Sequence, residues 1–558
     1  MSGALQQLDA LVRAFFARFF ESEITSATDG LKGPFFWLLA TLAVPGLFIP
    51  WIMAFEWQLL GRMEGPEAVR VASVAEKTFY LGFSMMASGV VTVIAWGSLL
   101  PDKRDTLILG SLPVKPSLVV SAKLLALAGY VGFVALFMQG VAAVFWGMIL
   151  GDSATLGFAV RGIWAHLIAC SLASMAVCIA VAAAQGMLLS IAGPRLFRPI
   201  STILQAVLVG TMALCLALLP VMTSSIVATL SGAAGAKPWL FVMPPVWFLG
   251  IYERLLGTSN PTLISLASRG WTAFGAAVVL VVITYPIAYR RLMVSVIETG
   301  SEPRHRLARL VHGLVVRFAG RDSSARAAAE FFSATLARVD RQRFVTAIAL
   351  GVAIAWGLPG WMGFQPSADP QPGVLALPLA AMMFLLVGLR VAASLPADVR
   401  ASWVFQVHDI SRRSARQGLE RVMFLLAVLP PVLLSTLVLG YLWGGPVAVT
   451  HGVIMAGVGV VLLELLIWHC DEMPCGQQWT PARADFGRRW PLHFAVFLIV
   501  VSALPKLEVL LFAHPYAAAG FVVYLLAVAA GVRYVSARHQ IIPIYEEVDP
   551  VAGVLRLQ

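Results

Sequence analysis

The stretch WGSLLPDKRDTLILGSLPVKPSLVVSAKLLA, which covers Trp96–Ala126, ends one long apolar run and begins the next. The apolar run before it, 78–100, stops at Pro101, and a cluster of four charged residues follows at 102–105. A short apolar stretch, Thr106–Leu112, then leads through a proline-rich turn into another long apolar run. This pattern predicts a short amphipathic helix on a membrane face, held between two membrane-crossing helices.

The composition is that of a multispanning membrane protein. Of the 558 residues, 59% are hydrophobic and only 12% are charged, whereas about a quarter of the residues in soluble domains are charged. The formal net charge is +11. Because the basic residues fall in alternate loops, this charge predicts membrane topology and contact with anionic lipids, and it does not indicate nucleic-acid binding.

Apolar runs of about 20 residues predict about twelve membrane-spanning helices. In chain order the runs cover 34–55, 78–100, 121–149, 163–192, 201–228, 270–289, 344–363, 373–395, 423–443, 447–468, 490–512 and 515–533. The positive-inside rule places the Lys- and Arg-rich loops, and with them both termini, in the cytoplasm. We therefore expect a multi-pass protein of the plasma membrane, the inner membrane in a bacterium.

The predicted spans divide into two halves of about six each. Transporters built from two parallel repeats have the same kind of division. A basic cytoplasmic linker, 296–343, separates the first half, 1–295, from the second, 344–558. Amphipathic helices precede the first span of both halves, at 4–20 and 325–342, and a Leu-Pro pair closes the second span of each. These correspondences indicate a degenerate duplication, so that one chain supplies both halves as a pseudo-dimer.

The motifs of several enzyme classes are missing from the sequence. It contains no G-x-x-x-x-G-K-[ST] phosphate loop, no H-E-x-x-H and no G-x-S-x-G, so we expect the chain not to be an enzyme. Any ATP that drives it is hydrolysed by another chain. The run HCDEMPC at 469–475 has ligand-type side chains but lacks a second ligand pair, and no metal site is predicted.

Ionisable residues are rare at the centres of the predicted spans. Arg390 and Glu464 lie within two turns of cytoplasmic ends and form a candidate intramembrane pair. Lys506 and Glu508 follow Pro505 near the outer end of a span, where we expect water to be close. Ion-driven carriers need ionisable groups at mid-bilayer depth, so this pattern argues against that class.

With these residues in view, the segment 101–123 resembles the coupling segment of ABC-2-type permeases, the membrane subunits of ATP-binding-cassette exporters. The resemblance rests on the charged cluster and the T-L-x-L-x-S-L-P run within Asp102–Lys123. Two further features are similar to the plan of that family, the amphipathic helix 4–20 and a short re-entrant stretch at 239–256. The second half matches by layout only.

The resemblance implies an all-α permease of two six-helix halves, which exports a substrate with ATP hydrolysed by a separate cytoplasmic ATPase dimer. It implies no cofactor on this chain. Apolar side chains would enter a groove on the ATPase, and charged ones would set the register. The implied contact residues of the first half are Asp102, Lys103, Arg104, Asp105, Leu109, Leu112, Pro113 and Lys115. Those of the second half are Asp398, Arg400, Asp409 and Arg412.

Two other classes of function stay open at this point. An integral membrane enzyme that acts on lipid-linked substrates would need acidic residues at one membrane face, and Glu56, Glu64, Glu67 and Glu76 fit that requirement. A non-transporting assembly or sensor protein could use the same coupling geometry without moving a substrate.

Overall fold

The structure, a computed structural model, describes part of the chain in detail, and every regular element in that part is helical. Contacts between the helices divide the chain into two compact units. Unit 1 lies within Met1–Arg306, Arg338–Pro366 and Gln478–Phe497, and unit 2 lies within Leu307–Ala337, Ser367–Gln477 and Leu498–Gln558. The described residues are 2–20, 33–99, 112, 114–150, 156–231, 237–297, 313–315, 317–318, 322–362, 367, 369–395, 412–468, 475 and 495–538.

Ten helical segments of the described residues are long and apolar enough to cross a membrane. They confirm a multi-pass membrane protein, and they coincide with ten of the spans that the sequence predicts. The other two predicted spans, 34–55 and 344–363, coincide with helices α2 (Gly33–Met63) and α12 (Asp340–Met362). Some side chains of both helices lie outside the described part, and neither helix is among the ten.

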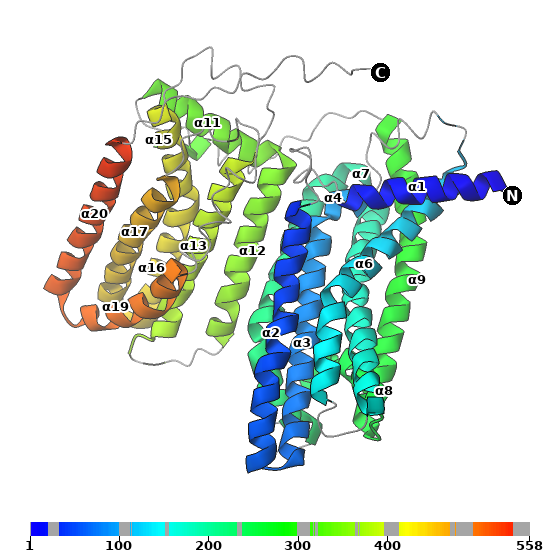
Figure 1. Cartoon of the computed structure of the whole chain (residues 1–558). Helices are drawn as coiled ribbons and strands as arrows, with labels where there is room; N and C mark the ends of the chain where they lie inside the picture. Colours follow the sequence, from blue (N-terminus) through cyan, green and yellow to red (C-terminus); the bar gives the residue numbers. More distant parts are fainter. Residues whose placement is uncertain are drawn as a thin grey trace. The chain divides into compact units, whose positions relative to one another are not determined.

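Unit 1 is a helical bundle in which α1 lies across one end and α8 lies at the other (Figure 1). Helix α12, which opens the second half of the chain, packs against α7 in this unit. Besides α2 and α12, the elements of unit 1 are α1 (Ser2–Phe20), α3 (Pro66–Ile94), α4 (Trp96–Leu99), α6 (Pro116–Leu150), α7 (Leu156–Ser231), η1 (Pro238–Val242), α8 (Pro244–Leu256) and α9 (Pro261–Ile297).

Helix α7 consists of two membrane-crossing arms that meet at Gly193. The φ angle of Gly193 is +69°, in a region where a side chain would be strained and glycine is not. Pro194 follows directly, and a residue before proline is disfavoured in the helical region. The kink therefore separates the candidate spans Ala159–Gly193 and Ile200–Pro220.

Small residues bring two pairs of helices in unit 1 into backbone contact. On α8, a Cβ added to Gly250 would lie 2.6 Å from the carbonyl oxygen of Leu263 on α9. On α7, a Cβ added to Gly210 would lie 3.1 Å from the carbonyl oxygen of Gly351 on α12. Close approach through small residues is the usual way in which helices associate inside a membrane, where the hydrophobic effect adds little.

Unit 2 is a second helical bundle, in which α11 lies across one end beside α15 (Figure 1). Two of its helices contain a π-helical turn. Each turn ends two residues before a proline, Pro430 or Pro505, which has no N–H to donate to the preceding turn. The elements are α11 (Ser323–Arg338), α13 (Pro372–Ser394), α15 (Arg412–Met423), η3 (Phe424–Val428), α16 (Leu429–Trp443), α17 (Gly445–Ile467), η4 (Ile499–Ala503), α19 (Leu504–Phe512) and α20 (Pro515–Arg538).

The amphipathic helices α1 and α11 each pack on the helix that follows a predicted coupling segment. Phe16 of α1 lies 3.5 Å from the position of a Cβ on Gly129 of α6. A Cβ on Gly418 of α15 would lie 2.7 Å from the carbonyl oxygen of Ala325 on α11. The contact at Gly129 is an ordinary van der Waals distance, whereas the approach at Gly418 leaves no room for a side chain.

We expect Gly250→Ala to lower the apparent melting temperature of the detergent-solubilised protein. The added methyl group would meet the backbone of α9, and overpacking of this kind costs about 1–3 kcal/mol. Gly275→Ala on α9 is the control, because a Cβ there has no neighbour within 4 Å. A melting temperature for Gly250→Ala equal to that of the control would contradict the close packing of α8 on α9.

Candidate functional site

The structure describes only part of the predicted coupling interface. Leu112 is 49% exposed, and the carbonyl oxygen of Lys115 accepts a hydrogen bond from the N–H of Leu118 in the first turn of α6. Arg412 is the first residue of α15. The other predicted contact residues lie outside the described part, so their roles stay predictions: Asp102, Lys103, Arg104, Asp105, Leu109, Pro113, Asp398, Arg400 and Asp409.

The helical turn α4, directly before the predicted coupling segment, is held by three side chains from other helices. Gln185 Nε2 donates to the carbonyl oxygen of Trp96 over 2.9 Å, and Tyr285 Oη donates to that of Leu99 over 2.6 Å. In the opposite direction, Trp96 Nε1 donates to Ser201 Oγ over 2.8 Å. All five residues are buried. We refer to these three hydrogen bonds as the α4 clamp.

The α4 clamp supplies hydrogen-bond donors to carbonyl groups at the end of a helix, which every helix end inside a membrane needs. The last carbonyl groups of a helix have no intrahelical partner, and a buried polar group without a hydrogen bond costs free energy. At Trp96 and Leu99, side chains from α7 and α9 donate to the carbonyl groups. Together with the bond from Trp96 to Ser201, they tie both arms of α7 and helix α9 to the residues directly before the predicted coupling segment.

On the other flank of the segment, a buried lysine faces helix α1. Lys123 of α6 is 2% exposed, and its Nζ lies 4.7 Å from the centroid of the Phe15 ring. Phe15 itself is 3% exposed and belongs to the same apolar cluster as Leu99. A cation over an aromatic face is attracted by the ring quadrupole. Helix α1 thus contacts the protein core on both sides of the predicted coupling segment.

The far end of unit 1 holds a buried polar layer that joins α8 to α3 and α7. Lys77 Nζ lies 2.7 Å from Glu253 Oε1, with the two side chains 4% and 13% exposed. The Tyr252 hydroxyl lies 3.3 Å from His166 Nδ1, and the Trp146 ring stacks on His166 with centroids 5.4 Å apart. Burial raises the pKa of Tyr252 well above its ordinary value, so the phenol keeps its proton.

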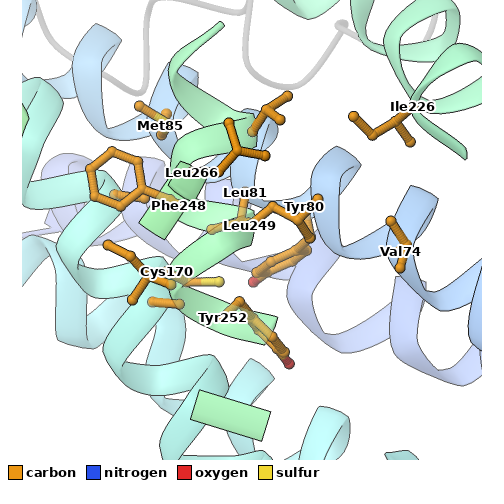
Figure 2. Packing of buried hydrophobic residues seen from close by; sticks show 14 of the residues in the cluster. Val74, Tyr80, Leu81, Met85, Cys170, Ile226, Phe248, Leu249, Tyr252 and Leu266 are labelled. Atoms are coloured by element: carbon orange, nitrogen blue, oxygen red, sulfur yellow. The ribbon is translucent and has the colours of Figure 1, made fainter. Parts of the chain in front are cut away.

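The apolar part of this layer is a packed cluster around the same tyrosine. Figure 2 shows Tyr252 near Cys170 and Tyr80, with Phe248 and Leu249 of α8 in the same group. Helix α8 is only 13 residues long, or about 20 Å, which is too short to cross a bilayer core of about 30 Å. Its burial and the pairing of Lys77 with Glu253 hold it against the spanning helices.

In unit 2, Glu464 is the centre of an ion network at one end of the bundle. Its carboxylate lies 2.9 Å from Arg416 Nη2 and 3.0 Å from Arg533 Nε, and its side chain is 3% exposed. Arg533 also pairs with Glu420. Arg390, which the sequence pairs with Glu464, donates through Nε to the carbonyl oxygen of Leu466 over 3.1 Å. The partners that the structure gives Glu464 are thus arginines of α15 and α20.

A second buried pair in unit 2 overturns an expectation from the sequence. Glu508 of α19, expected near water, is fully buried, and its Oε2 lies 2.7 Å from Nδ1 of the equally buried His451 of α17. The residues are 57 positions apart, and His451 has no distinctive local pattern. Only the fold brings them together. The one sequence feature that could have indicated the pair is a histidine within an apolar span, which is uncommon.

The loop that contains HCDEMPC enters the described part at a single residue. Cys475 has a φ of +59°, and its N–H donates to the carbonyl oxygen of Ala393 over 2.8 Å. Within the described residues, no group of three or more His, Cys, Asp and Glu side chains could hold a metal ion.

Comparison with known proteins adds nothing to this geometry, because no family model, curated protein or solved structure matches the chain.

We expect His451→Leu to destabilise unit 2 strongly, because it leaves the buried carboxyl group of Glu508 without its partner. Breaking a buried pair in this way costs about 3 kcal/mol or more, whereas replacement of both members by apolar residues is close to neutral. The double variant His451→Leu/Glu508→Leu should therefore recover most of the loss in apparent melting temperature. A double variant no more stable than the single one would contradict the pairing.

Proposed function

We propose that the chain is the membrane-spanning permease subunit of an ABC-type exporter, driven by a separate cytoplasmic ATPase. In this proposal the protein lies in the plasma membrane, the inner membrane of a bacterium, with both termini in the cytoplasm. The coupling segment then faces the ATPase, and the outer polar layer around α8 lies at the other side of the membrane. The transported substrate moves through one chain that supplies both halves.

The observation that carries the proposal is the α4 clamp. A coupling segment can drive transport only if its displacement reaches the helices that line the pathway. Gln185, Ser201 and Tyr285 connect the start of the segment to both arms of α7 and to α9 by hydrogen bonds of 2.6–2.9 Å.

The packing of α1 on α6 and of α11 on α15 supports an equivalent arrangement in both halves. In each case an amphipathic helix lies against the helix that follows a predicted coupling segment, with a glycine at the contact. The partner of the basic side chain differs between the two units. Lys123 lies over an aromatic ring in unit 1, whereas Arg416 pairs with Glu464 in unit 2. Each basic residue is fixed close to the chain's return into the membrane.

We expect a nucleotide-binding subunit to co-purify with the detergent-solubilised protein. Leu112→Glu should lower its recovery about tenfold, because the substitution puts a carboxylate into an apolar contact. Pro113→Gly should lower it less, since it changes only the shape of the turn. Leu59→Glu is the control, as Leu59 is 53% exposed on α2 and far from the segment in the chain. Absence of any ATPase from all samples would favour the membrane-enzyme alternative.

The α4 clamp makes a separate prediction about coupling. Tyr285→Phe removes the donor to the carbonyl oxygen of Leu99, worth about 1 kcal/mol, and should reduce stimulation of ATP hydrolysis by the permease about fivefold without loss of ATPase binding. Tyr289→Phe is a matched control, because the equally buried Tyr289 hydroxyl makes no hydrogen bond among the described residues. Equal stimulation by both variants would show that the clamp does not transmit the signal.

A further inference from the structure

An open groove of about 400 Å³ lies in unit 1 where α2, α3 and the second arm of α7 meet. Its walls are mostly apolar, with Ile49, Ile52 and Met53 on α2 and Phe79 on α3. Two carboxylates, those of Glu56 and Glu76, also line it. The volume is within the range of pockets that hold drug-sized molecules.

The polar and apolar residues occupy different depths of this groove. Glu56 follows Ile49 by seven positions on α2, which places the carboxylate about 10 Å further along the helix axis. On α3, which runs in the opposite direction through the membrane, Glu76 precedes Phe79 by about one turn. The acidic end of the groove therefore lies toward the α2–α3 connection, and the apolar end lies deeper in the bundle.

The carboxylate of Glu76 has an unused capacity for a hydrogen bond. Its Oε2 is buried and has no hydrogen-bond partner among the described residues. The indole N–H of Trp57 lies beside it but does not form a hydrogen bond of normal geometry. Lys77, the next residue, is committed to Glu253. A buried carboxyl group without a partner costs free energy, which a ligand with a positive donor would recover.

We propose that this groove binds an amphiphilic cation, with a positively charged amine between Glu56 and Glu76 and an apolar tail along Ile49, Ile52 and Met53. The Phe79 ring adds a face for the cation. An anionic ligand would meet two carboxylates, and a neutral ligand would leave the charges of both without a counter-charge. The inference deepens the proposed function, and rests on it, by naming the substrate class that the permease accepts from the membrane.

The test measures binding to the full-length protein in phosphatidylcholine nanodiscs by isothermal titration calorimetry. The probe is octylammonium, whose –NH3+ group can donate hydrogen bonds, and octyl sulfate and octyl glucoside are the anionic and neutral probes with the same tail. We expect the cation to bind at least tenfold more tightly than either of the others. Glu76→Gln and Glu56→Gln should each weaken its binding about tenfold, because each removes a charged partner but keeps the size of the side chain.

Glu64→Gln is the control variant, since Glu64 is exposed beyond the end of α2 and does not line the groove. Equal binding of the three probes, or unchanged cation binding in both groove variants, would overturn the inference. The assay contains no ATPase. Cation binding without a co-purifying ATPase would therefore support the groove and refute the exporter, whereas a co-purifying ATPase without cation binding would refute the groove alone.

Discussion

A chain inside a bilayer must satisfy its backbone hydrogen-bonding groups without water, and this constraint governs the places where the helices of this protein begin, bend and end. Where α3 gives way to α4, the carbonyl groups of Trp96 and Leu99 accept hydrogen bonds from Gln185 and Tyr285. These bonds also attach the start of the predicted coupling segment to the bundle. One physical requirement thus supports both the stability of the turn and its proposed role in transmission.

The fold was largely predictable from the sequence, because length and hydropathy determine which segments can cross a membrane. Side-chain pairing across the bundle was not. Glu464 contacts Arg416, which lies 48 positions before it in the chain, and Arg533, which lies well after it. No local pattern distinguishes these two arginines from the others in the predicted cytoplasmic loops. The α4 clamp was equally hidden, since Gln185 resembles any weakly polar residue of an apolar span.

The two units use different chemistry at equivalent positions. In unit 1 the helix after the predicted coupling segment carries Lys123 over the ring of Phe15, and in unit 2 the corresponding helix carries Arg416 on Glu464. Both arrangements give a favourable partner to a basic side chain, fully buried at Lys123 and partly buried at Arg416, next to an amphipathic helix that lies across the bundle end (Figure 1). In the proposed exporter one chain supplies both halves, so neither half has to pair with a copy of itself and the two can diverge in this way.

The separation of buried partners along the chain has a consequence for biogenesis. Lys77 precedes Glu253 by 176 residues, and His451 precedes Glu508 by 57. Each early residue is inserted while its partner is still unsynthesised, so α3 and α17 enter the membrane with an uncompensated polar group. Neither pair can form until its later helix, α8 or α19, has been synthesised. Until then water, lipid headgroups or neighbouring protein must accommodate the polar side chains of Lys77 and His451.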